Sequence, residues 1–333
     1  MPVKKVLLIG GAGFIGLRIA QFLSEERTAC ATTIIDNFFR GKEDEYLIHL
    51  RGKYNIKVIQ ADCTQPAAFD TLDKDYDHVY MLASVVGVEY TTQMPDEIIR
   101  INTALIYNTL EWLKTASCGK VVFTSTSECY AGTIEAFNYA IPTPEKIPLC
   151  IEDIRHPRFT YAVTKMLGES GFMNYARVHG FKCTVVRYHN VYGERMGFKH
   201  VIPQVTQRFY NKENPFKIYG ADQTRAFCYV DDAVEGTVLS MEQDGADGEI
   251  IHIGVQDEIK IEEIVKYIGT LVGFDGAYEA VPAPDGSVSR RCPDISKAKR
   301  LLGYQPRVDY KTGVKRTFDW YMNYLKTGKK AYE

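Results

Sequence analysis

Two short motifs in this chain combine residue types that could perform redox chemistry. Tyr161 and Lys165 lie four residues apart, so on a helix a phenol and an amine would share one face. Near the N-terminus, the run KVLLIGGAGFIG breaks an apolar segment with glycines and then continues with a helical pattern. In that context Gly10, Gly13 and Gly16 predict a dinucleotide pyrophosphate seated on a helix N-terminus. Together the motifs indicate hydride transfer involving a nicotinamide, whereas the Tyr–Lys pair alone would equally fit an ordinary helix surface.

The residues around the glycine motif should complete a cofactor site. Asp36 ends the next apolar segment, where a carboxylate accepts hydrogen bonds from ribose hydroxyls and repels a 2′-phosphate. This favours NAD over NADP, although Arg40 nearby leaves room for NADP. A turn-forming Asp36 and a helix-capping Asp62 are the simpler alternatives. The predicted cofactor contacts also include positions at strand ends and at the helix start, namely Phe14, Ile15, Asn37, Asp62, Cys63, Leu82 and Ala83, together with Tyr161 and Lys165.

These residues need a sheet whose strands end at one edge. Short β-branched runs alternate with helical stretches through the first half of the chain. Continuous apolar strands separated by helices predict a parallel sheet that is covered on both faces. We therefore expect an α/β fold, a doubly wound parallel sheet of the Rossmann type with its ligand crevice at the carboxyl ends of the strands. The predicted strands are 5–9, 32–36, 57–60, 78–83, 120–125 and 182–187, and the predicted helices are 14–26, 43–51, 95–116 and 160–179.

Composition excludes several other classes of protein. The chain has 333 residues and a net charge of −2, which argues against a nucleic-acid-binding protein with a basic stripe. No apolar run approaches the roughly 18 residues of a membrane span, and the first apolar run is too short for a signal peptide. The eight cysteines and seven histidines show no metal-ligand spacing. We therefore expect reduced thiols, no metal site and a cytoplasmic location.

Five motifs occur in an order that is typical of one family. They are GGAGFIG, the strand-end Asp36, the run STSECY that contains Thr126, the Tyr161-x-x-x-Lys165 pair, and RYHNVYG. In these motifs the chain resembles the extended short-chain dehydrogenase/reductases, the NAD-dependent epimerases and dehydratases of nucleotide sugars, from about residue 4 to 325. The resemblance implies NAD as cofactor and Tyr161 as the base that removes a proton from a sugar hydroxyl. Lys165 and a positive nicotinamide should lower the pKa of that phenol, while Thr126 contacts the same sugar oxygen.

The residues that follow Thr126 bear on the reaction. Ser127 and Glu128 resemble the T-S-E run of GDP-mannose 4,6-dehydratases and UDP-glucuronate decarboxylases, in which the Glu acts at the sugar C5. The simpler reading is a Glu at a loop end or helix cap. The run QTRAFCYVDD and the segment that begins at Arg290, RRCPDI, are closest to UDP-glucuronate decarboxylases. That resemblance gives Arg291 two open roles, in decarboxylation or in binding a pyrophosphate.

The C-terminal half should supply the substrate contacts. A guanidinium binds phosphate bidentately, so Arg225 is predicted to clamp the diphosphate; an ion pair with Asp231 or Asp232 is the alternative. The other predicted substrate contacts are Asn190, His200, Arg291 and Asp294. The chain departs from the family pattern at His189, where phenylalanine is common, and at Glu194, where proline is usual. We expect these changes to line the sugar pocket.

The resemblance also divides the chain and orders the hypotheses for its function. Residues 1–189 with about 236–254 should form the NAD-binding domain, and 190–235 with 255–333 a smaller α/β lobe that binds the nucleotide sugar, in which 274–289 would be a loop. The foremost hypothesis is a UDP-hexuronate decarboxylase or 4,6-dehydratase-type lyase that works through a transient 4-keto sugar. The alternatives are a nucleotide-sugar 4-epimerase or a C3/C5 epimerase, and more distantly a non-catalytic dinucleotide sensor. We expect a homodimer, as in the relatives, with no nucleic-acid or membrane partner.

Overall fold

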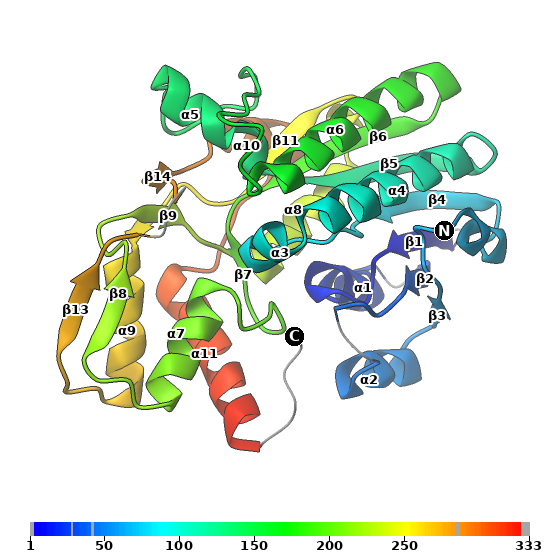
Figure 1. Ribbon diagram of the computed structural model, residues 1–333. Helices are drawn as coiled ribbons and strands as arrows, with labels where there is room; N and C mark the ends of the chain where they lie inside the picture. Colours follow the sequence, from blue (N-terminus) through cyan, green and yellow to red (C-terminus); the bar gives the residue numbers. More distant parts are fainter. Residues whose placement is uncertain (1–2, 28, 41–42, 284–286, 328–333) are drawn as a thin grey trace.

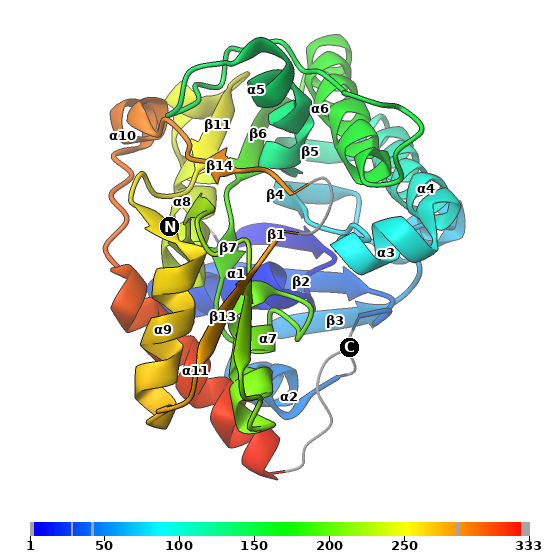
Figure 2. The ribbon, with the colours of Figure 1, turned by 60° about the vertical axis from the view of Figure 1, so that its left-hand side comes forward.

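A computed structural model describes residues 3–27, 29–40, 43–283 and 287–327. Its centre is a seven-stranded parallel sheet in the order β11-β6-β5-β4-β1-β2-β3, and the smaller lobe lies beside the carboxyl ends of the strands (Figures 1 and 2). The predicted doubly wound α/β fold is confirmed. The strands of the sheet are β1 (Lys4–Ile9), β2 (Cys30–Asp36), β3 (Ile56–Gln60), β4 (Asp75–Met81), β5 (Ser117–Thr126), β6 (Lys182–Tyr188) and β11 (Ile250–Ile253).

Helices cover both faces of this sheet, which is why its strands are apolar almost throughout. Val6 and Leu8 of β1 point into the core beneath α1 and α8, whereas Leu7 and Ile9 point into the core beneath α4 and α6. The covering helices are α1 (Phe14–Glu26), α2 (Glu45–Lys53), α4 (Pro95–Leu113), α6 (Phe159–His179) and α8 (Val230–Glu242), with the short helices η1 (Pro66–Thr71), α3 (Val88–Gln93), η2 (Ser127–Tyr130), α5 (Ala131–Phe137) and η3 (Asp244–Ala246).

The smaller lobe is built from helices and short paired strands, at the left of Figure 1. Its helices are α7 (Val201–Tyr210), α9 (Ile261–Val272) and α11 (Tyr310–Thr327), whereas α10 (Ser296–Leu302) packs against β11 and α8 of the sheet domain. Its strands are β7 (Val191–Tyr192), β8 (Phe216–Tyr219), β9 (Thr224–Ala226), β10 (Cys228–Tyr229), β12 (Glu258–Lys260), β13 (Tyr278–Val281) and β14 (Arg290–Arg291). Residues 328–333, which the sequence assigned to this lobe, lie outside the described residues.

One local prediction was wrong. The stretch 274–289 is not a continuous loop, because β13 lies within it and pairs in parallel with β8. Four residues among glycines and prolines carry little local signal, and the strand forms because β8, some 60 residues away in sequence, offers its edge. Residues 284–286 of that stretch lie outside the described residues.

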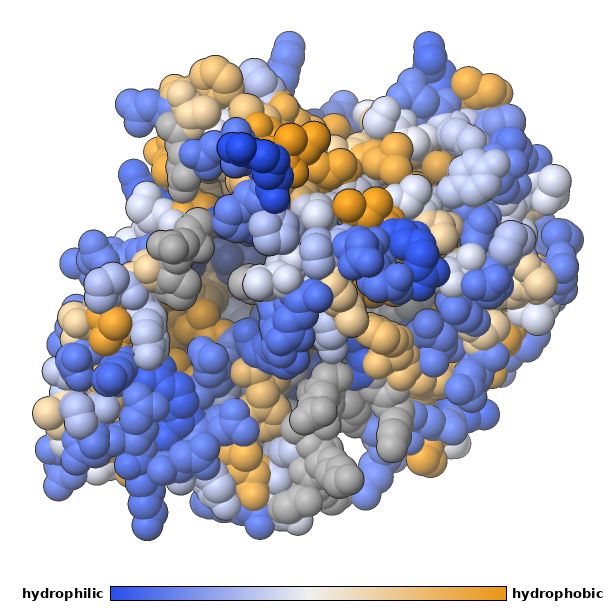
Figure 3. Space-filling view, in the orientation of Figure 1, coloured by the Kyte–Doolittle hydropathy of each residue, from blue (hydrophilic) through white to orange (hydrophobic). Residues whose placement is uncertain are grey.

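The surface of the sheet domain has one apolar region of note. Ile99 and Tyr107 of α4 and Val163 and Leu167 of α6 are each between 41% and 56% exposed. On the face shown in Figure 3, hydrophobic residues gather over α6. None of the helices in the described part of the chain is long and apolar enough to span a membrane.

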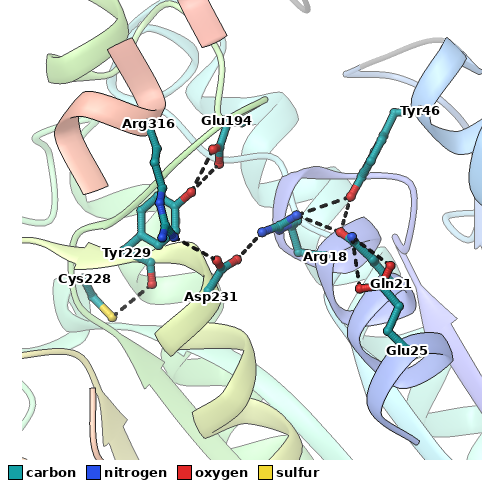
Figure 4. Close-up of polar contacts among 9 residues, drawn as sticks. All are labelled: Arg18, Gln21, Glu25, Tyr46, Glu194, Cys228, Tyr229, Asp231 and Arg316. Atoms are coloured by element: carbon teal, nitrogen blue, oxygen red, sulfur yellow. Dashed lines mark hydrogen bonds and ion pairs between the residues drawn. The ribbon is translucent and has the colours of Figure 1, made fainter. Parts of the chain in front are cut away.

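A polar network links α1 to α8 and to the smaller lobe (Figure 4). Arg18 of α1 forms an ion pair with Asp231 at the start of α8, and Asp231 also lies 3.8 Å from Arg316 of α11. Beside them the Tyr229 hydroxyl donates to Glu194 at 2.8 Å. The network thereby joins α1 to α8 of the sheet domain and brings Arg316 of the smaller lobe close to the same carboxylate.

Candidate active site

The glycine loop sits where β1 ends between β2 and β4, at the point where the strand order reverses. Gly10 has φ +80°, and a Cβ there would lie 2.6 Å from the backbone of Ala83 after β4. A Cβ on Gly16 would lie 2.7 Å from Gly11. At Gly13 the nearest atom to a Cβ is the Gly10 carbonyl oxygen at 3.4 Å. Packing thus requires glycine at the first two positions, whereas Gly13 leaves open space above the loop.

This open space lies at the N-terminus of α1. Gly13 is the N-cap residue and supplies no side chain, so the backbone N–H groups of the first turn, Phe14, Ile15 and Gly16, receive no side-chain acceptor. Free N–H groups at a 13-residue helix and a cradle without side chains suit a pyrophosphate. A dinucleotide therefore fits the residues that are present.

Asp36 ends β2 beside the loop. Its carboxylate accepts hydrogen bonds from Ala12 N at 3.0 Å and Phe38 N at 2.8 Å. Burial raises the pKa of this carboxyl, while the backbone N–H groups of Phe38, Ala12 and Asn37 act against the shift. Each oxygen retains a second lone pair for a hydroxyl. Asp36 is therefore placed both to fix the loop and to accept from a ribose, and the neighbouring Asn37 is exposed.

Four other predicted cofactor contacts line the same edge of the sheet. Leu82 and Ala83 follow β4, and their N–H groups both bond to the Ile9 carbonyl at 2.9 Å. Asp62 is exposed and accepts from Thr64 N at 3.0 Å, which is a local turn. Cys63 is buried, and burial raises the pKa of its thiol to about 12, so it lines the site as an apolar group.

Helix α6 brings Tyr161 and Lys165 down onto β5. A Cβ on Gly168 would lie 2.2 Å from the Phe123 ring of β5, so glycine lets the helix approach the strand closely. The Lys165 ammonium donates to the Thr124 carbonyl at 2.8 Å and lies 5.8 Å from the centre of the Tyr161 ring. Burial lowers the pKa of Lys165 to about 8. The amine and the phenol are thus neighbours at the end of β5.

The Tyr161 phenol is governed by burial in the protein alone. Burial raises the pKa of this phenol, whereas its hydrogen bond with Thr126 at the end of β5 opposes the rise. In the protein alone burial dominates, so the fall in the pKa of Tyr161 that the sequence predicts from Lys165 and a bound nicotinamide stays a prediction. A fall below the ordinary value requires the additional positive charge of a nicotinamide.

Glu128 lies two residues beyond Thr126, in η2, and is held between two arginines. Arg291 forms an ion pair with one carboxylate oxygen, and Arg158 Nη2 donates to the other at 3.1 Å. Burial would raise the pKa of the Glu128 carboxyl, but the charges of Arg291 and Arg158 outweigh it and hold that pKa at about 2. Glu128 is therefore an ionised group that orients the arginines. Such a weak base is poorly suited to remove a proton from C5.

Arg291 and Arg225 are register partners on the parallel strands β14 and β9. Arg225 donates to the Thr224 carbonyl at 2.8 Å and the Gln223 side chain at 3.1 Å. Burial and the neighbouring Arg291 charge lower the pKa of Arg225 to about 10. The alternative partner Asp231 is instead paired with Arg18, and the Asp232 carboxylate accepts from backbone N–H groups of residues 307 and 308.

The other predicted substrate contacts lie in different parts of the fold. Asn190 follows β6 and donates to the Ala226 carbonyl at 3.4 Å. His200 precedes α7, and burial with the nearby Arg40 charge lowers its pKa to about 4. Ser127 is buried, and Arg291 Nη1 lies 3.4 Å from its hydroxyl. Asp294 accepts from Ser296 N at 2.8 Å, two residues on and just before α10, which is a local turn.

Of the two departures from the family pattern, His189 does not line the sugar pocket as expected. His189 is fully buried, and its ring nitrogen lies 2.9 Å from the Tyr130 hydroxyl. The Glu194 carboxylate accepts a hydrogen bond from the Tyr229 hydroxyl. His189 is therefore a core residue, whereas Glu194 is half-buried and its place in the sugar pocket stays a prediction.

Sequence reasoning missed Arg158 and the position of Arg40. Arg158 stands three residues before Tyr161, a spacing that places both on one side of a helix start, and this signal was available. Arg40 lies 3.7 Å from where a Cβ on Gly197 would be, so it reaches across to the substrate lobe. Only the tertiary structure shows that approach. Within residues 3–27, 29–40, 43–283 and 287–327, no three His, Cys, Asp or Glu side chains could together hold a metal ion.

This geometry can be compared with known proteins. The model of the NAD dependent epimerase/dehydratase family matches residues 6–254. The chain belongs to this family. It is therefore an NAD-dependent enzyme of the extended short-chain dehydrogenase/reductase type, and the resemblance found in its sequence is confirmed.

Relatives within the family cover nearly the whole chain. A UDP-N-acetyl-alpha-D-glucosaminuronate decarboxylase from Bacillus cytotoxicus is 33% identical, over 96% of this family member and 98% of the relative. A UDP-glucuronate 4-epimerase from Thermodesulfobacterium geofontis is 32% identical, over 94% and 95%. The structure of UDP-glucuronic acid 4-epimerase from Bacillus cereus, in complex with UDP-glucuronic acid and NAD, has a TM-score of 0.83 and 25% identity, over 96% and 99% of the two chains.

Proposed function

We propose that this enzyme is a UDP-hexuronate decarboxylase. The observation that carries the proposal is the Glu128 carboxylate held by Arg291 and Arg158 beside Thr126 and Tyr161. A site that already binds one carboxylate through two guanidinium groups can bind the carboxylate of a hexuronic acid. The similarity to the Bacillus cytotoxicus decarboxylase extends over 96% of the chain and supports this choice.

The residues can carry the steps in order. NAD, when bound, supplies a hydride acceptor for the sugar C4 and later returns the hydride. Tyr161 takes the proton of the C4 hydroxyl, while Thr126 orients that oxygen. A ketone at C4 makes the substrate a β-keto acid, whose C5–C6 bond breaks to release CO₂ as its electron pair moves toward the C4 oxygen. The arginines hold the carboxylate until release, and a solvent proton then adds to C5.

The weak basicity of Glu128 separates decarboxylation from dehydration. A dehydratase needs a base that removes the C5 proton, and a carboxylate whose pKa is held at about 2 is a poor one. Decarboxylation needs no base at C5, because the leaving CO₂ provides the electron pair. The position of Glu128 between the two arginines thus favours a decarboxylase over a 4,6-dehydratase.

The proposal is tested by product analysis. The purified enzyme is incubated with UDP-glucuronate, UDP-N-acetylglucosaminuronate and UDP-glucose in separate reactions, and each product is measured by mass spectrometry and NMR. Loss of one CO₂ from either uronate supports the proposal. Loss of water from UDP-glucose, or an inverted C4 with unchanged mass, contradicts it.

A 4-epimerase is the second candidate. The observation that favours it is the similarity to the Thermodesulfobacterium geofontis UDP-glucuronate 4-epimerase, at 32% identity. Epimerisation would use the same Tyr161 and Thr126 with a carboxylate that is retained. Conversion of UDP-glucuronate to its C4 epimer, without CO₂, would select this candidate.

We also infer that the enzyme is a homodimer joined through α4 and α6. The exposed Ile99, Tyr107, Val163 and Leu167 lie on these two helices, and hydrophobic residues gather over α6 (Figure 3). Apolar patches of this kind mark association surfaces. Light scattering after size-exclusion chromatography should give twice the monomer mass, and Leu167→Glu should give the monomer.

The eight free thiols suit the reducing cytoplasm, which is the location we infer.

A further inference from the structure

The short helix η2 is too short to hold itself in place, although it carries groups of the candidate active site. It spans four residues, Ser127–Tyr130, between Thr126 and α5. A 3₁₀ helix of this length makes few hydrogen bonds of its own, so its geometry is set by contacts with the rest of the protein. At its start, the Thr126 hydroxyl accepts from the Glu128 N–H at 3.2 Å. The direction in which Thr126 and Glu128 point thus depends on what holds the other end of η2.

Tyr130 ends η2 and is fully buried, and a histidine meets its hydroxyl. That hydroxyl lies 2.9 Å from Nε2 of His189, which is also fully buried and directly follows β6. The His189 backbone N–H donates to the Ile253 carbonyl of β11 at 3.1 Å. A single side-chain hydrogen bond therefore joins the end of η2 to the central sheet.

The His189 imidazole is a neutral group in a charged neighbourhood. Its ring lies 4.7 Å from the His252 ring, and the Arg187 guanidinium lies 5.9 Å from the centre of the Tyr130 ring. Burial, the neighbouring His252 and the charges of Arg291 and Arg187 lower the pKa of His189 well below its ordinary value. A neutral imidazole can form a hydrogen bond with the phenol hydroxyl, whereas a phenylalanine would fill the same space without one.

The packing behind His189 also reaches the segment that supplies Arg291. A Cβ on Gly254 would lie 2.9 Å from His189 Cβ and 3.2 Å from the Pro293 ring, so both side chains press on the same glycine. Pro293 comes two residues after Arg291, which forms an ion pair with Glu128 of η2. One packed unit therefore stands behind both halves of that ion pair.

We propose that His189 is a positioning residue for the reaction, which acts through Tyr130 to hold η2 so that the Thr126 hydroxyl and Tyr161 meet the same substrate oxygen. Thr126 and Tyr161 already share a hydrogen bond in the structure. Without the bond to His189, η2 reaches this alignment less often, and turnover falls while nucleotide binding is kept. The inference goes beyond the proposed function, because proton transfer at the C4 hydroxyl is common to decarboxylation and to epimerisation.

The first measurement needs no substrate. Hydrogen exchange followed by mass spectrometry, on the enzyme with NAD, reports how often the amides of residues 126–131 open. His189→Phe keeps a ring of similar size but removes the bond, so this segment should exchange about 3- to 10-fold faster than in the wild type. His189→Gln keeps a donor and an acceptor and should recover most of the protection. Peptides from α1 should exchange at the wild-type rate in both variants.

The second measurement is turnover, with whichever of UDP-glucuronate, UDP-N-acetylglucosaminuronate and UDP-glucose the wild type converts fastest. His189→Phe should lower kcat by about 5- to 50-fold and change KM by less than about twofold. Tyr130→Phe should have the same effect, since it removes the same bond from the other side. The double variant should therefore lose no more than either single variant, and His189→Gln should recover most of kcat.

Thr184→Val is the matched control. Thr184 lies on the same strand as the residue before His189, is fully buried and donates to the Ala246 carbonyl at 2.7 Å. This variant also loses one buried hydrogen bond, so its free energy of unfolding should fall as in His189→Phe, while kcat and the exchange of residues 126–131 stay at the wild-type values. Wild-type exchange and kcat in His189→Phe would overturn the proposal. An equal fall in kcat in Thr184→Val, or losses that multiply in the double variant, would also overturn it.

The proposed function and this inference fail separately. Product analysis of the wild type decides between decarboxylation and epimerisation, whereas the exchange rate and kcat of His189→Phe decide the role of His189. An enzyme that epimerises UDP-glucuronate and shows both effects would disprove decarboxylation and keep the role of His189. A decarboxylase whose His189→Phe variant shows neither effect would do the reverse.

Discussion

On its cofactor side the crevice presents backbone N–H groups, glycines and one carboxylate, whereas on its substrate side it gathers three arginines around Glu128. The first side is a single stretch from β1 to β2, in which Gly10 and Gly16 are required by close backbone contacts. The second side is assembled from η2, the start of α6, and β9 and β14. The cofactor side can therefore be altered one residue at a time, while a change on the substrate side leaves unpaired charges behind.

Tyr161, where the two sides meet, should show the largest effect. Tyr161→Phe removes one hydroxyl that transfers the proton at C4, so we expect turnover to fall by about 10²- to 10⁴-fold. The phenol lies on a helix surface at the crevice and its ring would remain, so folding and NAD content should be unchanged. Steady-state kinetics with circular dichroism and cofactor absorbance check this. Near-normal turnover would remove Tyr161 from the mechanism.

The backbone side should be sensitive to a single methyl group. Gly10→Ala introduces a Cβ 2.6 Å from the Ala83 backbone at φ +80°, and we expect a loss of about 2–5 kcal/mol in the free energy of unfolding. Gly180→Ala is the matched control, because Gly180 has φ +82° with nothing within 4 Å. It should cost only about 1–2 kcal/mol. Equal losses in chemical denaturation would mean that the close contact with Ala83 is unimportant.

The charged side should be sensitive to pH. The pKa of Glu128 is lowered from 4.5 to about 2, so its ion pairs contribute stability that is fully present above about pH 4.5 and is lost as the pH falls toward 2. That contribution is on the order of 3 kcal/mol. The free energy of unfolding of the wild type should therefore approach that of Glu128→Gln as the pH falls from about 4.5 to about 2. Parallel pH curves for the two proteins would show that Glu128 is not held ionised.

Asp36→Asn should show the smallest effect on the cofactor side. Loss of the charged acceptor should weaken NAD binding by about tenfold, and loss of its repulsion should narrow the preference for NAD over NADP. The Asn oxygen can keep one of the two bonds from Ala12 N and Phe38 N, so the loop should stay folded. Titration of both cofactors, followed by fluorescence, measures the ratio. A wild type that prefers NADP would contradict the role of Asp36.

The difference between the two sides also decides what could be read from the sequence. The glycine run, the strand-end Asp36 and the Tyr161–Lys165 pair each depend on residues that are close in the chain, because strand, turn and helix follow from local spacing. The helix Phe14–Glu26 and the strands of the sheet were accordingly predicted to within a few residues, except at β11. The strand β13 was missed, since its pairing partner lies far away in sequence.

The sequence by itself determined the alternation of strands and helices, the glycine loop and the pairing of a phenol with an amine on one helix face. Only the tertiary structure decided that Glu128 would lie between Arg158 and Arg291, residues that are 133 positions apart in the chain. It also decided that the Lys165 ammonium would point at the Thr124 carbonyl. Local propensity and hydrophobic period act over a few residues, whereas the charge on a buried carboxylate depends on which distant side chains the packed core brings within reach of it.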